Sequence, residues 1–237
     1  MMLATLRMIQ ICDSLFPIGA FTLSNGLETL IVNKTITDGN ALEEYVSSFL
    51  SILPYNDLGV MMLSYGHAHD MDFIKELDHF SMALKAPEEV RTGSKKLCSR
   101  FLKIYKEFDG AADHNYPALD NYRCSVLGDP SQTISSFCIG NHAIAVGLFA
   151  NDIGLDKDEA ASIYTYSLLN AIVTNGVKMI PLSQMIGQKI LSLSQKKILQ
   201  AVHQAATLQM DDLGVGGVGI DIASMKHEEL YSRLYMS

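Results

Sequence analysis

The chain has 237 residues, enough for one large domain or two small ones with a sizeable buried core. Its formal net charge of −8 and pI near 5.3 argue against nucleic acid or an anionic membrane as the main partner, because both select for basic surfaces. Hydrophobic residues make up 48% of the sequence, with 12 methionines, so we expect another chain to cover some apolar surface.

The N-terminal stretch is apolar, but Arg7, Gln10 and Asp13 interrupt it and no small-residue cleavage site follows, so it is not a convincing signal peptide. No run of eighteen apolar residues occurs, so we expect no membrane-spanning helix. The cysteines lie far apart and form no CxxC pair, which favours reduced, mostly buried thiols in a cytosolic protein. They are Cys12, Cys98, Cys124 and Cys138.

Apolar residues recur at three- and four-residue spacing through most of the chain, which is typical of helices. The first half predicts helices over residues 38–53, 58–65, 73–80 and about 87–108. Asp38 is the expected N-cap of the first of these, because its side chain can accept hydrogen bonds from unpaired backbone N–H groups.

Residues 109–133 are rich in Gly, Pro, Asp and Asn and lose this spacing, which predicts a long, mobile connection that could carry one short helix. Three further helices follow, roughly over 134–151, 157–179 and 183–209. No internal repeat and no linker between two cores is visible. The sequence therefore predicts an all-α, single-domain helical bundle.

The helix expected from Ser135 contains many small residues, among them Gly140 and Gly147. Glycine destabilises a helix interior by about 1 kcal/mol relative to alanine, so its use there calls for a reason. The usual reason is the close approach of another backbone. Packing within the chain is the interpretation we favour, and a dimer seam is the alternative.

One predicted helix carries six of the eighteen basic residues of this acidic chain. Some of them share one side at helical spacing. A solvated face is the commoner outcome, and a docking stripe for an acidic partner is the sharper interpretation. The six residues are Arg91, Lys95, Lys96, Arg100, Lys103 and Lys106.

The best metal candidate is "HAHD", which contains His67, His69 and Asp70. Residues two apart on a helix face different ways, although an extended turn could present all three to nickel or zinc. We favour the interpretation that these residues form a solvated helix end rather than a metal site. No P-loop, GxSxG or HExxH motif occurs, so the sequence gives no positive sign of an enzyme.

The chain ends in "LGVGGVGID" and then "HEELYSRLYMS". The glycines follow a predicted helix rather than a strand, which excludes a dinucleotide loop and favours a flexible joint. Beyond them Leu230, Tyr231 and Leu234 can share one face of a helix, with Arg233 beside it. We predict that residues 221–237 form a helical tail that becomes ordered on a partner, and packing on the chain's own body is the alternative.

Four stretches taken together resemble the UreF family of urease accessory proteins. They are "DSLFPIGAFTLSNGLETLI" (13–31), "IYTYSLLNAIVTNGVKMIPLSQMIGQKIL" (163–191), "MDDLGVGGVGIDIASMKHEELYSRLYMS" (210–237) and, more weakly, "NHAIAVGLFANDIGL" (141–155). The resemblance runs in order along nearly the whole chain. Residues 55–133 carry little of it.

The resemblance implies a cytosolic all-α homodimer without catalytic activity and without a cofactor of its own. Such a protein binds UreD (also called UreH) and the GTPase UreG, and the complex supports GTP-dependent nickel insertion into apo-urease. It would place the partner-binding residues at the N-terminal corner, where a purely structural role is equally open, and in the tail. They are Phe21, Thr22, Glu28, His227, Glu228, Leu230, Tyr231, Arg233 and Leu234.

Two other functions stay open at this point. One is a helical metal-binding protein or metalloenzyme that uses His67, His69 and Asp70. The other is an all-α regulator of a different GTPase, which would keep the partner-binding tail but have no role in urease maturation.

Overall fold

A computed structural model describes residues 2–108, 115–128 and 137–235. These residues form α-helices joined by turns and short 3₁₀ helices, and they contain no β-strand, so the all-α prediction is confirmed. The α-helices are α1 (Met2–Ile11), α2 (Leu27–Val32), α3 (Gly39–Ile52), α4 (Asp57–Gly66), α5 (Met71–Leu84), α6 (Glu88–Ile104), α7 (Pro117–Leu127), α8 (His142–Asp152), α9 (Lys157–Met179), α10 (Gln184–Ala205) and α11 (Val218–His227).

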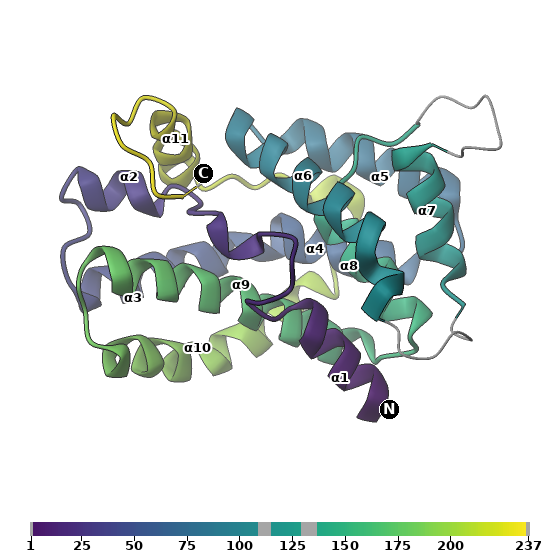
Figure 1. Cartoon of the computed structure of the whole chain (residues 1–237), viewed down its shortest axis with the longest axis horizontal. Coiled ribbons are helices and arrows are strands. Elements are labelled where there is room, and N and C mark those ends of the chain that lie inside the picture. The colour runs from purple at the N-terminus through teal and green to yellow at the C-terminus, as the bar shows by residue number, and fades with distance from the viewer. Residues whose placement is uncertain (1, 109–114, 129–136, 236–237) are drawn as a thin grey trace.

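The helices pack around a single apolar core (Figure 1). Helices α3, α9 and α10 run side by side at one end, and α5, α6, α7 and α8 form the other end. The C-terminal helix α11 lies beside α2, and α1 projects at the edge of the body against α9. The first and last parts of the chain are therefore both on the surface.

Several helices begin where a local capping side chain predicts it. Asp38 accepts hydrogen bonds from the backbone N–H groups of Asn40 and Ala41 at 2.9 and 3.0 Å, as expected for the N-cap of α3. Asp156 caps α9 in the same way, and Ser183 caps α10. These starts depend only on residues within one turn, which is why the sequence shows them.

The predicted helix over 134–151 begins later than expected, at His142. Residues 134–136 lie outside the described residues. Gly140 has a φ of 103°, which is incompatible with a right-handed helix, so this glycine is not part of the small-residue helix that the sequence predicted.

A buried carboxylate explains this delayed start. Asp78 of α5 is fully buried and accepts hydrogen bonds from the N–H groups of Ile139, Gly140 and Asn141 at 2.6, 3.1 and 3.0 Å. The Tyr122 hydroxyl donates to the same carboxylate at 2.5 Å. N–H groups that donate to Asp78 are not available to a helix interior, so this carboxylate holds the segment outside regular structure until α8 begins.

The described part of the mid-chain connection contains a helix. Within residues 109–133, the range Pro117–Leu127 forms α7, which packs against α8, and Tyr122 of this helix is fully buried. The one short helix that the sequence allowed in this connection is α7, which buries Ala118, Leu119 and Tyr122, and the mobility of the connection stays a prediction. Residues 109–114 and 129–133 lie outside the described residues.

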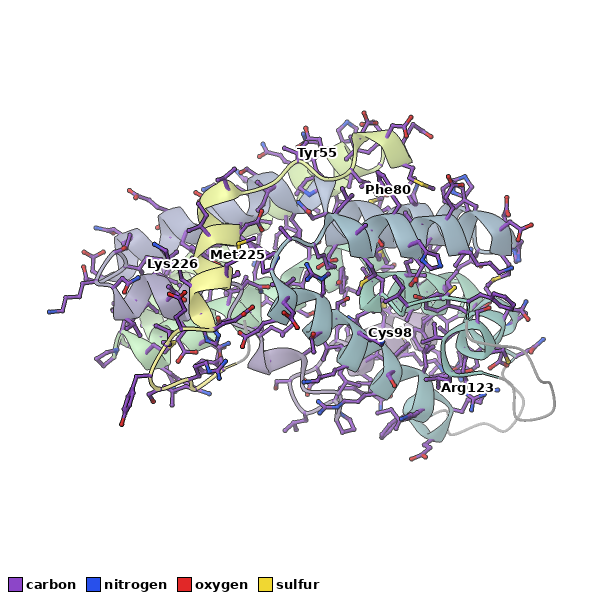
Figure 2. The ribbon with its side chains drawn as sticks, turned by 90° about the horizontal axis from the view of Figure 1, so that it is seen from above. Tyr55, Phe80, Cys98, Arg123, Met225 and Lys226 are labelled. Atoms are coloured by element: carbon purple, nitrogen blue, oxygen red, sulfur yellow. The ribbon has the colours of Figure 1, made fainter. Side chains whose placement is uncertain are left out.

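The stretch Gly39–Gly66 is long and apolar enough to cross a membrane, but 61% of it is buried inside the body. It is not one continuous α-helix, since α3 and α4 are separated by the 3₁₀ turn Leu53–Tyr55, which contains Pro54. Its apolar character is explained by its place in the core. The four cysteines are all free, and burial raises the pKa of Cys12 to about 12. Figure 2 shows Cys98 inside the body.

The tightest helix crossing joins α4 and α8, and Gly147 makes it possible. A Cβ atom at Gly147 would lie 2.2 Å from Ser64 Oγ and 2.3 Å from the Met61 carbonyl oxygen. The Ser64 hydroxyl itself donates to the Met61 carbonyl at 2.8 Å, so neither atom is free to move away. Close approach within the chain, the interpretation favoured from the sequence, is confirmed at Gly147.

Gly147→Ala should therefore destabilise the protein by about 2 kcal/mol or more, although alanine is the better helix former. Gly66→Ala is the matched control, because Gly66 is also helical and its Cβ would meet no atom within 4 Å. Chemical denaturation of both variants provides the measurement. Equal stability of the two variants would show that the α4–α8 crossing can relax.

Candidate partner-binding site

The N-terminal corner brings α2 against α11. Gly19 and Gly26 have φ values of 84° and 81°, a backbone conformation that suits glycine, and Gly26 immediately precedes α2. A Cβ at Gly26 would lie 2.9 Å from the Ile220 carbonyl oxygen and 3.0 Å from the Ser224 nitrogen. Gly26 therefore packs closely against the backbone of α11.

Next to this contact, two buried side chains meet. Glu28 of α2 is 1% exposed, and His227, the last residue of α11, is fully buried. His227 Nε2 lies 2.9 Å from a Glu28 oxygen, and His227 Nδ1 lies 2.6 Å from an oxygen of Glu89 at the start of α6. When both carboxyl groups are ionised, each contact is a hydrogen bond only if the ring nitrogen carries hydrogen, so the fully paired arrangement requires an imidazolium.

The residues after α11 complete the network. The backbone N–H groups of Leu234 and Tyr235 donate to the Glu28 carboxylate at 2.8 and 3.0 Å. The Arg233 guanidinium donates to Glu89 at 2.7 Å. Two carboxylates are therefore matched by two cations and two backbone donors, as burial of charge requires. We call Glu28, Glu89, His227 and Arg233 the tail network.

This geometry corrects the prediction that glycines isolate the tail from the core. Helix α11 spans Val218–His227, starts directly after the glycine run, and is bound to α2 and α6. Beyond His227 the chain turns instead of continuing as a helix, which allows its N–H groups to reach Glu28. The alternative drawn from the sequence, a last helix packed on its own body, describes α11. Residues 236 and 237 lie outside the described residues.

The apolar side chains of the tail nevertheless face solvent. Tyr231 is fully exposed and Leu234 is 73% exposed, whereas Leu230 is half-buried. Partner binding by these residues remains a prediction. Of the other predicted residues, Glu228 is exposed, and the Phe21 carbonyl accepts a hydrogen bond from Asn175 Nδ2 at 3.2 Å. Thr22 ends the 3₁₀ turn Ala20–Thr22, and its side chain is outside what the structure describes.

Helix α11 also has an apolar outer side that the sequence reasoning did not single out. Val218, Ile222 and Met225 recur at four- and three-residue spacing, and each is exposed. We call these three residues the α11 stripe. Figure 2 shows α11 on the outside of the body, with Met225 labelled. The inner side of α11, with Ala223, Ser224 and His227, is buried against the body. Its outer side is the exposed α11 stripe.

A second exposed apolar surface lies where α1, α9 and α10 meet. It is a groove of about 510 Å³, and its charged lining among the described residues is limited to Asp13. The sequence analysis did not predict this groove. Its signal in the sequence is the four-residue spacing of the uncharged residues Ser162, Tyr166 and Asn170 along α9. The lining residues are Ile9, Cys12, Asp13, Ser14, Ser162, Ile163, Tyr166, Ser167, Asn170, Gln195, Ile198 and Leu199.

Comparison with known proteins identifies the family. The UreF family model matches residues 36–195. The urease accessory protein UreF of Actinobacillus pleuropneumoniae serotype 5b (strain L20) is 37% identical over 234 residues, covering 97% of each chain. The chain belongs to the UreF family. Relatives named urease accessory protein UreF from Haemophilus influenzae (strain PittGG) and Streptococcus salivarius (strain 57.I) are 34% and 32% identical, covering 97% and 98% of this chain and 94% of each relative.

In this UreF-family chain the candidate metal residues do not converge. His67 Nδ1 lies 3.0 Å from the Leu63 carbonyl oxygen, and the ring stacks on Phe73 with centroids 3.8 Å apart. Asp70 caps α5 by accepting from the Phe73 N–H at 3.0 Å, while His69 is exposed. Across the described ranges, no three His, Cys, Asp or Glu side chains are grouped to hold a metal ion. The geometry agrees with a solvated helix end.

The basic residues of α6 divide into two kinds. Arg91 donates to the carbonyls of Lys85 and Ala86, and Arg100 donates to the Ile18 carbonyl at 2.9 Å. Lys95, Lys96 and Lys103 are exposed, and so is Lys106, which lies in the 3₁₀ turn Tyr105–Phe108 after α6 and pairs with Asp120 at 2.7 Å. Both arginines thus bind backbone carbonyls within the chain, Arg100 is nevertheless exposed like the lysines, and docking of an acidic partner on this helix stays a prediction.

Glu28→Ala should destabilise the protein by about 3–5 kcal/mol, because it leaves a buried imidazolium and two backbone N–H groups without their acceptor. Glu44→Ala on the exposed side of α3 is the control and should melt like the wild type. Thermal unfolding of the two variants provides the comparison. If both melt together, Glu28 does not carry the contact between α2 and the tail.

Proposed function

We propose that this chain is a non-catalytic scaffold in urease maturation, acting in the cytoplasm within a UreD(UreH)–UreF–UreG complex. The complex supports GTP-dependent insertion of nickel into apo-urease. Nickel and GTP are bound by the partner proteins, and this chain supplies surfaces that bring the partners together. The single observation behind the proposal is that two apolar surfaces, the groove and the α11 stripe, stay uncovered on a tightly packed body of the UreF family.

The groove between α1, α9 and α10 is the proposed homodimer interface. Met2, Leu3 and Leu6 are exposed apolar residues of α1, the helix that lines the groove through Ile9, and we take them as its ridge. A ridge beside a groove is self-complementary, because a two-fold rotation can place each ridge in the partner's groove. An almost uncharged lining also suits a permanent apolar interface better than a charged partner.

The α11 stripe and the tail are the proposed UreD-binding surface. Apolar anchors at four- and three-residue spacing are what a helix presents to a hydrophobic groove. Tyr231, Leu234 and Arg233 lie directly after this helix, and tyrosine and arginine often carry interface energy. The body holds α11 in place, so little ordering entropy would be lost when a partner binds it.

Ile222→Asp combined with Met225→Asp should weaken UreD binding by about 100-fold or more, because two apolar anchors would be replaced by charges. Both side chains are exposed, so the melting temperature should stay close to that of the wild type. Phe137→Asp, an equally drastic change at an exposed apolar site before α8, is the control and should bind normally. Titration calorimetry with purified UreD, followed by a pull-down of UreG and apo-urease, provides the measurement. Unchanged UreD binding by the double variant would refute this surface.

Leu199→Asp should convert the homodimer into a monomer, because it places a charge in the apolar groove. Sedimentation equilibrium should give about twice the 26.0 kDa chain mass for the wild type and a single chain mass for the variant. Val32→Asp, at an exposed apolar position on α2, should remain dimeric. A wild-type protein that stays monomeric at high concentration would rule out the homodimer.

A further inference from the structure

We propose that a single proton on His227 controls whether the C-terminal segment stays docked on the body. The segment, residues 228–235, is held by the tail network, and that network is complete only when His227 is an imidazolium. Loss of the proton releases the segment. This switch is a property of the isolated chain and goes beyond the proposed scaffold function.

The geometry requires the proton. The two ring nitrogens point in opposite directions, to Glu28 on α2 and to Glu89 on α6, with distances of 2.9 and 2.6 Å. A neutral imidazole has one N–H and one lone pair. Without the extra proton, one ring nitrogen would turn its lone pair toward a carboxylate oxygen, and a buried position makes that repulsion costly.

The charges around His227 reinforce the effect. Deprotonation would leave two carboxylates facing one neutral ring, and the remaining cation of the network, Arg233, contacts Glu89. Burial, and then the Glu28 charge, raise the pKa of the Tyr235 hydroxyl, so this phenol adds no negative charge near Glu28. Other charged groups beside the network line the cleft between α6 and the tail; they are Glu88, Lys96 and Glu228.

Solvent can reach the network from that cleft, which has a volume of about 380 Å³. The Glu89 side chain is 23% exposed, whereas Glu28 is almost fully buried. A proton can therefore leave His227 through the Glu89 side without prior unfolding of α2. Once it has left, the Leu234 and Tyr235 N–H groups can exchange Glu28 for water.

The sign of the pH dependence follows from these contacts. The docked state holds one proton that the released state can lose, so docking is favoured at lower pH and weakened as pH rises. A one-proton switch changes the ratio of released to docked chains by at most about tenfold per pH unit. The segment is held by the Glu28 and Glu89 carboxylates, so strong acid would also weaken docking by removing their charges. Docking is therefore strongest at a pH between strongly acidic conditions and the pH at which the segment is released.

A single tryptophan can report the switch directly. The chain contains no tryptophan, and Tyr235 is half-buried with only its backbone N–H in the network, so Tyr235→Trp places one probe on the docked segment. Acrylamide quenching of the probe is measured in the isolated protein from about pH 6 to pH 9. Quenching should increase with pH, with the released-to-docked ratio rising several-fold to tenfold per unit.

Three variants in the probe background separate the proposal from a general loss of structure. His227→Gln cannot become a cation, so its segment should be released at every pH with no pH response. Glu89→Gln should stay docked at high pH, because the glutamine amide can donate to a neutral Nδ1 and its oxygen can still accept from Arg233. His203→Gln, an exposed histidine on α10, should respond like the unmodified probe protein.

A pH response that survives in His227→Gln would overturn the proposal, and so would a probe that stays equally protected over the whole range. If His227→Gln fails to fold, Glu89→Gln still decides, since continued release at high pH in that variant contradicts the switch. No partner protein is present in the experiment. Its result is therefore independent of UreD binding, and either proposal can fail without the other.

Discussion

A carboxylate can be buried in this helical body only where donors surround it, and two such carboxylates determine the path of the irregular segments. Asp78 gathers three successive backbone N–H groups and a tyrosine hydroxyl, which fixes the residues before α8. Glu28 gathers an imidazolium and two N–H groups, which fixes the tail. In both places a segment without regular structure uses its unpaired N–H groups to neutralise a charge contributed by a helix.

The rest of the body follows a different rule, the close contact of small residues. Gly147 lets α8 approach the backbone of α4, and Gly26 lets α11 approach the start of α2. These two contacts connect the middle of the chain and its end to the same core. The result is a body whose surfaces are held in shape, and the proposed scaffold function would use this to bind partners without large losses of entropy.

The tail combines a firmly held inner side with an exposed outer side. Charged groups anchor it inside, whereas Ile222, Met225 and Tyr231 face solvent. This division separates two tasks, since the charges determine where the segment lies and the apolar side chains remain available for a partner. Under the proposed switch, a change in the charge of His227 would move Tyr231 and Leu234, whereas Ile222 and Met225 would stay in place on α11.

The sequence alone determined the features that depend on neighbours within one helical turn. The all-α class, the helix over 157–179 and the Asp38 cap were predictable because apolar spacing and capping are local. The motifs of the UreF family were also readable, and they directed attention to Glu28 and His227. What those two residues do was not readable, because they lie 199 positions apart and contact each other only after the core has formed.

Tertiary structure alone decided the start of α8, the helix within 117–127, the groove beside α1 and the docking of the tail. Each depends on a partner from a distant part of the chain, as Asp78 does for Asn141 across 63 positions. In the sequence, the glycines and the amphipathic ending favoured a free tail. This local pattern gives no information about Glu28, the buried acid on α2 that binds the tail. The charge of Glu28 had to be compensated once it was buried, and the tail supplied the donors for it and for the partly exposed Glu89.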